Sequence, residues 1–255
     1  MSYAVDVISL VLFGLVVGSF LNVCIYRLPR GRSVVNPSSH CPSCKAFLRW
    51  FDTVPVIGYM MLRGRCRECK SVISFVYPMV EVLTAVLFVV QYAVVEISPV
   101  LVARFIFTSV LVVLFVTDLQ HRVLPDAVTI PGAIVGWCCA WFSPLGWLDS
   151  SIGIVVGGTL LFVVSETYYR IRGREGLGMG DVKMLAMIGA FLGWELMLAT
   201  LIMASVLGSL VGMMMVMSKR EDVRYALPLG SFLAISATAM SVVGEPVLTW
   251  YVSFY

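Results

Sequence analysis

Two aspartates, Asp118 and Asp181, are the residues whose surroundings most strongly suggest acid–base chemistry. Asp118 lies in VTDLQHRVLPDAVTIPG, at the end of an apolar run, and Asp181 lies in GLGMGDVKMLA, at the start of another. A carboxylate within or beside a membrane span is costly and is therefore informative about function. Two carboxylates that share a site do not both ionise easily, so one holds a proton while the other activates water. The pair predicts aspartic-protease chemistry.

Local structure explains a neighbouring aspartate, Asp126, better than it explains Asp118. Asp126 precedes an expected helix, so we interpret it as an N-cap, with catalysis as the alternative. Asp118 ends an apolar helix, where the helix dipole disfavours an anion. Its position therefore indicates a function, or a partner such as His121 or Arg122.

Glycines and a lysine surround Asp181 and form an expected substrate-approach loop. Gly178 and Gly180, like Gly176 before them, allow positive φ and let the backbone pass close to a peptide substrate. Lys183 lies roughly 200° around a helix from Asp181, so the two side chains need not face the same way. The alternative for Lys183 is an inner-edge lysine whose ammonium reaches toward water.

Four of the seven cysteines form two C-x-x-C pairs, CPSC at 41–44 and CREC at 66–69. Four thiolates close a tetrahedral structural Zn²⁺ site with no open position for catalysis. The sequence therefore predicts zinc held by Cys41, Cys44, Cys66 and Cys69. Two disulfides, or redox-active cysteines, are the alternatives, but stable disulfides are rare in the cytoplasm, where we expect this loop.

The composition is that of a membrane protein, which must position these residues with helices. The chain has 255 residues, of which 60% are hydrophobic and 13% are charged, whereas a soluble domain carries roughly 25% charged residues. We predict an all-α polytopic membrane protein with about eight transmembrane helices and a cytoplasmic zinc-binding loop after the first helix. The expected spans, each set against the ~20 residues that cross a bilayer, are 5–26, 77–95, 100–117, 127–142, 150–169, 182–194, 195–217 and 227–243.

The distribution of basic residues orients these spans. With the N-terminus outside, the inner loops hold 17 of the 18 Lys and Arg residues, and only Arg104 falls outside, as the positive-inside rule requires. Because that rule already accounts for the basic residues around the cysteines, we expect no nucleic-acid partner. The 36-residue run at 182–217 is too long for one crossing, so we expect a break near residues 193–195, and 182–194 is either a full span or a re-entrant helix. The first apolar run precedes Arg27 and is expected to be a retained helix.

Several motifs, and the order in which they follow one another along the chain, resemble those of the bifunctional type IV prepilin peptidases. These enzymes, also called prepilin leader peptidase/N-methyltransferases, are G-x-G-D aspartyl proteases of the membrane. GSFLNVCIYRLPRG at 18–31 resembles the N-terminal signature of that family, and residues 41–70 resemble its cysteine domain. The segment that enters the next helix in this family resembles YPMVE. Its two catalytic motifs resemble TDLQHRVLPDAVTIPG and REGLGMGDVKMLAMIGAFLG.

The resemblance implies a division of the chain into a first transmembrane helix at 1–26, a cytoplasmic, methyltransferase-associated cysteine domain at 27–76 and a transmembrane aspartyl peptidase domain at 77–255. It implies Asp118 and Asp181 as the catalytic pair. It further implies cleavage of the basic leader from type IV prepilins and pseudopilins at the cytoplasmic face of the bacterial inner membrane. The new N-terminus would then be methylated with S-adenosylmethionine. The sequence contains no G-x-G-x-x-G motif that would mark the binding site of this methyl donor. Asn22 and Glu81 are weak candidates for binding it.

Two other classes of protein are compatible with the composition. A proton-coupled carrier would use intramembrane acids, but carriers need ionisable groups near the bilayer midplane, whereas these carboxylates are expected at the inner edge. A scaffold of a secretion machine with a zinc hairpin would not require the pair of Asp118 and Asp181.

Overall fold

The computed structural model describes residues 3–36, 38–95, 97–173, 176–218 and 228–253, and over these residues its regular elements are helices. The chain divides into two compact units, Met1–Val94 and Val95–Tyr255. Each unit is described by itself.

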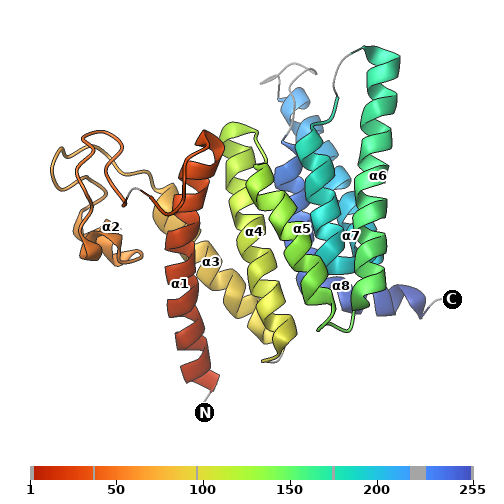
Figure 1. Cartoon of the computed structure of the whole chain (residues 1–255), viewed down its shortest axis with the longest axis horizontal. Coiled ribbons are helices and arrows are strands. Elements are labelled where there is room, and N and C mark those ends of the chain that lie inside the picture. Colours follow the sequence, from red (N-terminus) through yellow and green to blue (C-terminus); the bar gives the residue numbers. More distant parts are fainter. Residues whose placement is uncertain (1–2, 37, 96, 174–175, 219–227, 254–255) are drawn as a thin grey trace. The chain divides into compact units, whose positions relative to one another are not determined.

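The first unit is built on two long helices that pack against each other, α1 (Tyr3–Arg27) and α3 (Val76–Val94) (Figure 1). Gly14 and Gly18 stand four residues apart on α1, the spacing that lets membrane helices approach closely. A Cβ on Gly14 would lie 2.6 Å from the Cα of Ala85, and one on Gly18 would meet the α3 backbone equally closely. The two helices therefore pack backbone to backbone, which fixes the polar residues that follow Gly18.

The segment between α1 and α3 is mostly irregular. Outside residue 37, it contains two 3₁₀ turns, η1 (Leu28–Arg30) and η2 (Trp50–Thr53), and one short helix, α2 (Ile57–Met61). Two isolated antiparallel bridges pair His40 with Phe47 and Arg65 with Val72. Each bridge closes a tight turn around one C-x-x-C pair.

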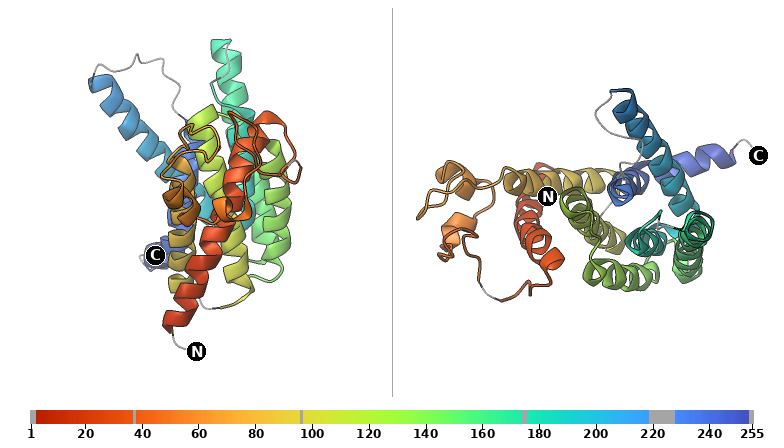
Figure 2. Two further views of the ribbon diagram at one scale, coloured as in Figure 1. Left: turned by 90° about the vertical axis from the view of Figure 1, so that its left-hand side faces the viewer. Right: turned by 90° about the horizontal axis from the view of Figure 1, so that it is seen from above.

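The described residues of the second unit form a bundle of five helices (Figures 1 and 2). They are α4 (Pro99–His121), α5 (Asp126–Ala140), α6 (Gly146–Arg172), α7 (Met179–Met217) and α8 (Leu229–Val252). α7 packs against α5, α6 and α8, and α4 packs against α5 and α8. Gly153 and Gly189 bring the backbones of α6 and α7 into direct contact.

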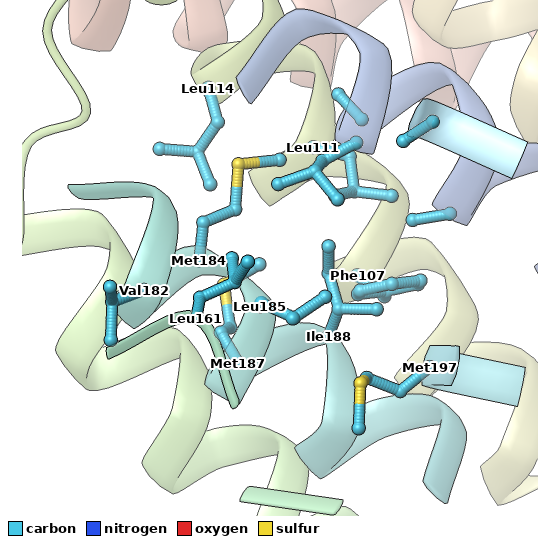
Figure 3. Close-up of a cluster of buried hydrophobic side chains, with 14 residues drawn as sticks. Phe107, Leu111, Leu114, Leu161, Val182, Met184, Leu185, Met187, Ile188 and Met197 are labelled. Atoms are coloured by element: carbon cyan, nitrogen blue, oxygen red, sulfur yellow. The ribbon is translucent and has the colours of Figure 1, made fainter. Parts of the chain in front are cut away.

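The core of this unit lies around the first half of α7 (Figure 3). Met184, Leu185 and Ile188 are fully buried and pack with Phe107 and Leu111 of α4. In a membrane, either lipid or other helices can cover the apolar faces of a helix, and here other helices cover these residues. This burial holds the start of α7, and with it Asp181, in a fixed position.

The expected break in the 182–217 run is confirmed, but the count of eight spans is not. Gly193 has φ 78° and ψ 175°, which is not helical, so α7 consists of two helical segments that meet there. Among the described residues, six helices are long and apolar enough to cross a membrane, and α5 is a shorter apolar helix. The eight expected segments differ because α7 supplies two of them and because α5, with 15 residues, falls short of a full crossing.

Candidate active site and metal centre

Asp118 lies three residues before the end of α4 and is buried, with 5% of its surface exposed. Its Oδ2 atom accepts hydrogen bonds from the backbone N–H of Ser231 at 2.6 Å and from the Ser231 hydroxyl at 2.8 Å. Ser231 is the third residue of α8, where backbone N–H groups have no partner within the helix. The N-terminus of α8 therefore offsets the unfavourable dipole at the end of α4. Ser231 is therefore a partner of the Asp118 carboxylate that the sequence alone did not identify.

Asp181 is the third residue of α7 and is partly buried. A Cβ on Gly178, the residue that precedes the helix, would lie 3.5 Å from the Asp181 Oδ2 atom. The carboxylate thus lies over the first turn of its own helix, where the dipole favours an anion. Both aspartates are held at helix N-termini, Asp181 at its own and Asp118 at that of another helix.

Leu124 packs against a glycine beside each carboxylate. A Cβ on Gly180 would lie 3.0 Å from the Leu124 Cβ, and one on Gly230 would lie 3.0 Å from both the Leu124 Cδ1 and the Asp118 Oδ2. The negative charge of Asp118 also acts on Asp181. The two aspartates that the sequence singled out, 63 positions apart, therefore each lie beside a glycine that packs against Leu124.

The glycines before Asp181 act differently from the expectation. Gly178 has φ −74°, and Gly180 is not among the positive-φ glycines, so neither uses the left-handed region. Gly180 is small because Leu124 packs against it, and a Cβ on Gly176 would overlap the ring of Tyr168. These glycines allow close packing within the protein itself.

Asp126 and Lys183 form an ion pair. The Lys183 Nζ atom donates to Asp126 Oδ1 at 2.8 Å and to Oδ2 at 2.7 Å. Asp126 is the first residue of α5 and makes no side-chain cap, since the N-cap position is Pro125. The expected N-cap was therefore wrong by one residue. Lys183 points to Asp126, in agreement with its placement about 200° around α7 from Asp181.

The four cysteines of the two C-x-x-C pairs gather in the first unit, with their sulfur atoms all within 4.8 Å of one another. The Sγ atoms of Cys41 and Cys69 are 3.9 Å apart, and those of Cys44 and Cys66 are 4.0 Å apart. Sulfurs placed ~2.3 Å from one Zn²⁺ ion in a tetrahedron would lie ~3.8 Å apart. The four sulfur atoms therefore fit one tetrahedral metal ion.

The two pairs are held by the same backbone pattern. In one turn, Lys45 N–H donates to Cys41 O, and in the other, Lys70 N–H donates to Cys66 O. Both lysines adopt positive φ, 59° and 60°. The backbone N–H of Cys44 lowers the pKa of Cys41 to about 6, which favours the thiolate that binds metal.

An ion pair outside the membrane helices joins the two parts of this loop. Arg67 donates to the Asp52 carboxylate at 2.5 Å, and the Asp52 side chain is 3% exposed. The hydrogen bond from Arg67 holds the pKa of Asp52 below its usual value. The turn at η2 is thereby tied to the second cysteine pair.

Asn22 and Glu81, from α1 and α3, both line one cavity of the first unit. The Asn22 side chain donates to the Tyr77 carbonyl at 3.0 Å, and the Glu81 carboxylate accepts from the Val56 N–H at 2.8 Å. Both side chains are buried. The fold thus brings together these two weak candidates from the sequence.

Fold and site together define a multi-pass helical membrane protein that has a pair of carboxylates in one unit and a four-cysteine cluster in the other. Residues 12–108 match the family described as Bacterial Peptidase A24 N-terminal domain, and residues 105–213 match the Type IV leader peptidase family. The chain belongs to the prepilin leader peptidase/N-methyltransferase family.

Three relatives carry the name prepilin leader peptidase/N-methyltransferase. The protein of Aeromonas salmonicida (strain A449) is 32% identical over 95% of this chain and 92% of its own length. That of Pseudomonas putida is 35% identical over 92% of this chain and 89% of its own length. That of Myxococcus xanthus is 39% identical over 83% of this chain, and this chain spans only 63% of its length. No solved structure matches the chain.

Proposed function

We propose that the chain cleaves the leader peptide from type IV prepilins and pseudopilins and then methylates the new N-terminal amine with S-adenosylmethionine. The names of the relatives support both activities. The observation that supports the peptidase half is that Asp118 and Asp181 each lie beside a glycine that packs against Leu124, close enough for the charge of Asp118 to act on Asp181.

In the proposed cleavage, the two carboxyl groups share one proton, so that one is protonated and the other is ionised. One carboxylate takes a proton from the attacking water while the other gives a proton to the nitrogen of the departing peptide. The two hydrogen bonds from Ser231 hold the Asp118 carboxylate in a single orientation during the reaction. Burial of Asp118 and partial burial of Asp181 reduce the competition of bulk water with the hydrogen bonds of the reacting peptide.

The metal in the first unit is proposed to be one structural Zn²⁺ ion. All four protein ligands would be thiolates, and such a closed site holds a fold together and leaves no position for a substrate. The resemblance of the two backbone turns and the sulfur spacings support this assignment. Cys41, Cys44, Cys66 and Cys69 would tie together a loop that has little regular structure of its own.

We further propose that the protein lies in the bacterial inner membrane, with its N-terminus outside and the aspartate pair at the cytoplasmic face. The six apolar helices make a lipid environment necessary. The basic residues, concentrated in the expected inner loops, support this orientation.

The experiment that tests the function uses the full chain, purified in detergent, with a prepilin and S-adenosylmethionine. Mass spectrometry should detect the free leader and a mature pilin that carries one added methyl group on its N-terminal nitrogen. The proposal would be contradicted if folded protein left the prepilin intact under conditions in which a characterised relative cleaves it.

A further inference from the structure

The first unit contains an open cavity of about 390 Å³ lined by residues of α1, of α3 and of the segment between them. This volume falls within the range of small-molecule sites, roughly 300–1,000 Å³. Among the described residues, those that line the cavity all lie between Ser19 and Glu81, within this unit. The Asp118 and Asp181 pair takes no part in it.

The walls of the cavity combine both signs of charge with aromatic rings. Glu81 and Arg27 line it and are 7% and 6% exposed, so both charges are largely shielded from water. Tyr26, Tyr59 and Tyr77 supply aromatic surface. Buried charges of opposite sign beside aromatic rings are unusual in a purely structural cavity, since each charge carries a cost of desolvation.

A strained turn closes the cavity on the side of the loop. Val56, which lines it, has φ 59° and ψ −50°, and the Ile57 N–H donates to the Pro55 carbonyl across it at 2.5 Å. This is a γ-turn of the rare, strained kind, and a β-branched residue is the least suited to it. The Glu81 carboxylate accepts the Val56 N–H and so holds the turn in place. Strain of this kind persists where the surroundings enforce it, and it is typical of ligand sites.

We propose that this cavity binds the methyl donor S-adenosylmethionine, an inference that rests on the proposed methyltransferase activity. The Glu81 carboxylate lies beside the sulfonium or ammonium charge of the donor, and Arg27 lies beside its carboxylate. The tyrosines contact the adenine ring and the sulfonium group, which are favourable partners for aromatic faces. The cysteine cluster forms part of the same wall, since Cys41 and Cys66 also line the cavity.

The methyl transfer then balances without any further reactant. The pilin amine first loses its ammonium proton to water. The lone pair of its nitrogen forms the new N–C bond as the C–S bond of the donor breaks. The sulfonium becomes the neutral thioether of S-adenosylhomocysteine, and the positive charge passes to the methylated amine.

Photocrosslinking maps the site directly and does not depend on turnover. The full chain in detergent is irradiated with methyl-tritiated S-adenosylmethionine, digested, and the labelled peptide is sequenced. We expect label within residues 19–81 and protection by excess unlabelled S-adenosylhomocysteine. Protected label confined to residues 95–255 would overturn the proposal, and so would an absence of protectable label in protein that methylates pilin.

A charge-only variant tests Glu81. In Glu81→Gln the side chain still has an oxygen to accept the Val56 N–H, so the turn is kept while the negative charge is lost. We expect at least about tenfold weaker binding of S-adenosylmethionine by calorimetry, with leader cleavage within about twofold of wild type as proof of folding. Glu68→Gln, an exposed change of the same kind outside the cavity, should bind normally.

The outcomes separate this inference from the proposed function. If wild-type protein methylates mature pilin but Glu81→Gln binds the donor as tightly as wild type, the cavity assignment fails and the function stands. If wild-type protein neither binds the donor nor methylates pilin, both fail.

Discussion

The two units hold their candidate chemistry by different means. In the first, the four cysteines sit in a segment with little regular structure, and the expected metal would give that segment its shape. In the second, Asp118 and Asp181 sit at the ends of long helices that an apolar core fixes in place. A loop site of the first kind depends on its ligands for its structure, whereas a helix-end site of the second kind keeps its structure when a catalytic side chain is changed. Substitutions in the two sites should therefore differ in their effects on folding and on activity.

The largest effect is expected from the aspartates themselves. Asp118→Asn and Asp181→Asn should each lower the rate of leader cleavage by ~10²–10⁴-fold, the usual contribution of a general acid or base. The protein should still fold, because Asn keeps the shape of the side chain and the core of α7 is untouched. Cleavage is measured on a purified prepilin, with Asp149→Asn, an exposed change of the same kind on α6, as the matched control. Full cleavage by either variant would remove that residue from the pair.

Cysteine changes should disrupt the first unit but not the second. Any one of Cys41→Ser, Cys44→Ser, Cys66→Ser and Cys69→Ser should remove most of the one zinc expected per chain. Since a structural Zn²⁺ ion supplies folding energy to a small domain, donor binding and methylation should be lost with it. Cleavage should fall by no more than a few-fold. Elemental analysis and thiol alkylation provide the measurement, and wild-type protein that holds no metal and has four reactive thiols would disprove the zinc assignment.

A smaller effect is expected from Ser231, which is expected to act through its hydrogen bonds to Asp118. Ser231→Ala removes one of the two hydrogen bonds to the carboxylate and leaves the backbone N–H in place. We expect about a tenfold fall in kcat, with KM nearly unchanged, because a hydrogen bond to a charged group is worth more than a neutral one. Ser236→Ala is the control on the same helix, since among the described residues the buried Ser236 hydroxyl has no hydrogen-bond partner. An equal fall in kcat in both variants would show that Ser231 contributes only through packing.

The smallest effect is expected from the ion pair between Asp126 and Lys183. The Asp126 side chain is 58% exposed and that of Lys183 is 35% exposed, and pairs of this kind contribute ~0–1 kcal/mol. Asp126→Asn should therefore cleave prepilin within about threefold of wild type. An Asp126→Asn protein that is inactive, beside an active Asp118→Asn, would show that the catalytic pair is Asp126 and Asp181.

The sequence was most informative where chemistry depends on local spacing. Two C-x-x-C pairs predicted the cluster of four sulfurs, and an aspartate opposed to its own helix dipole predicted that Asp118 has an unusual environment. The break at Gly193 followed from length alone. Each of these signals lies within a few residues or within one helix.

The sequence was least informative about contacts between distant residues. Ser231 is 113 positions from Asp118, and only the packing of α4 against α8 brings its hydroxyl to the carboxylate. A serine and a glycine in the first turn of an expected helix were the only available signal. Asp126 looked like a cap because Lys183, 57 positions away, could not be identified as its partner. The positive φ of Val56 had no signal at all, since valine rarely adopts it.

The most direct test of the account is whether the two activities can be separated in one protein. Asp181→Asn is incubated with S-adenosylmethionine and two substrates, an intact prepilin and the same pilin without its leader, and the products are identified by mass spectrometry. The account predicts that the intact prepilin stays uncut while the leader-free pilin gains one methyl group at a rate close to wild type. Loss of methylation on the leader-free pilin, in protein that still binds the donor, would contradict the placement of the two reactions in separate units.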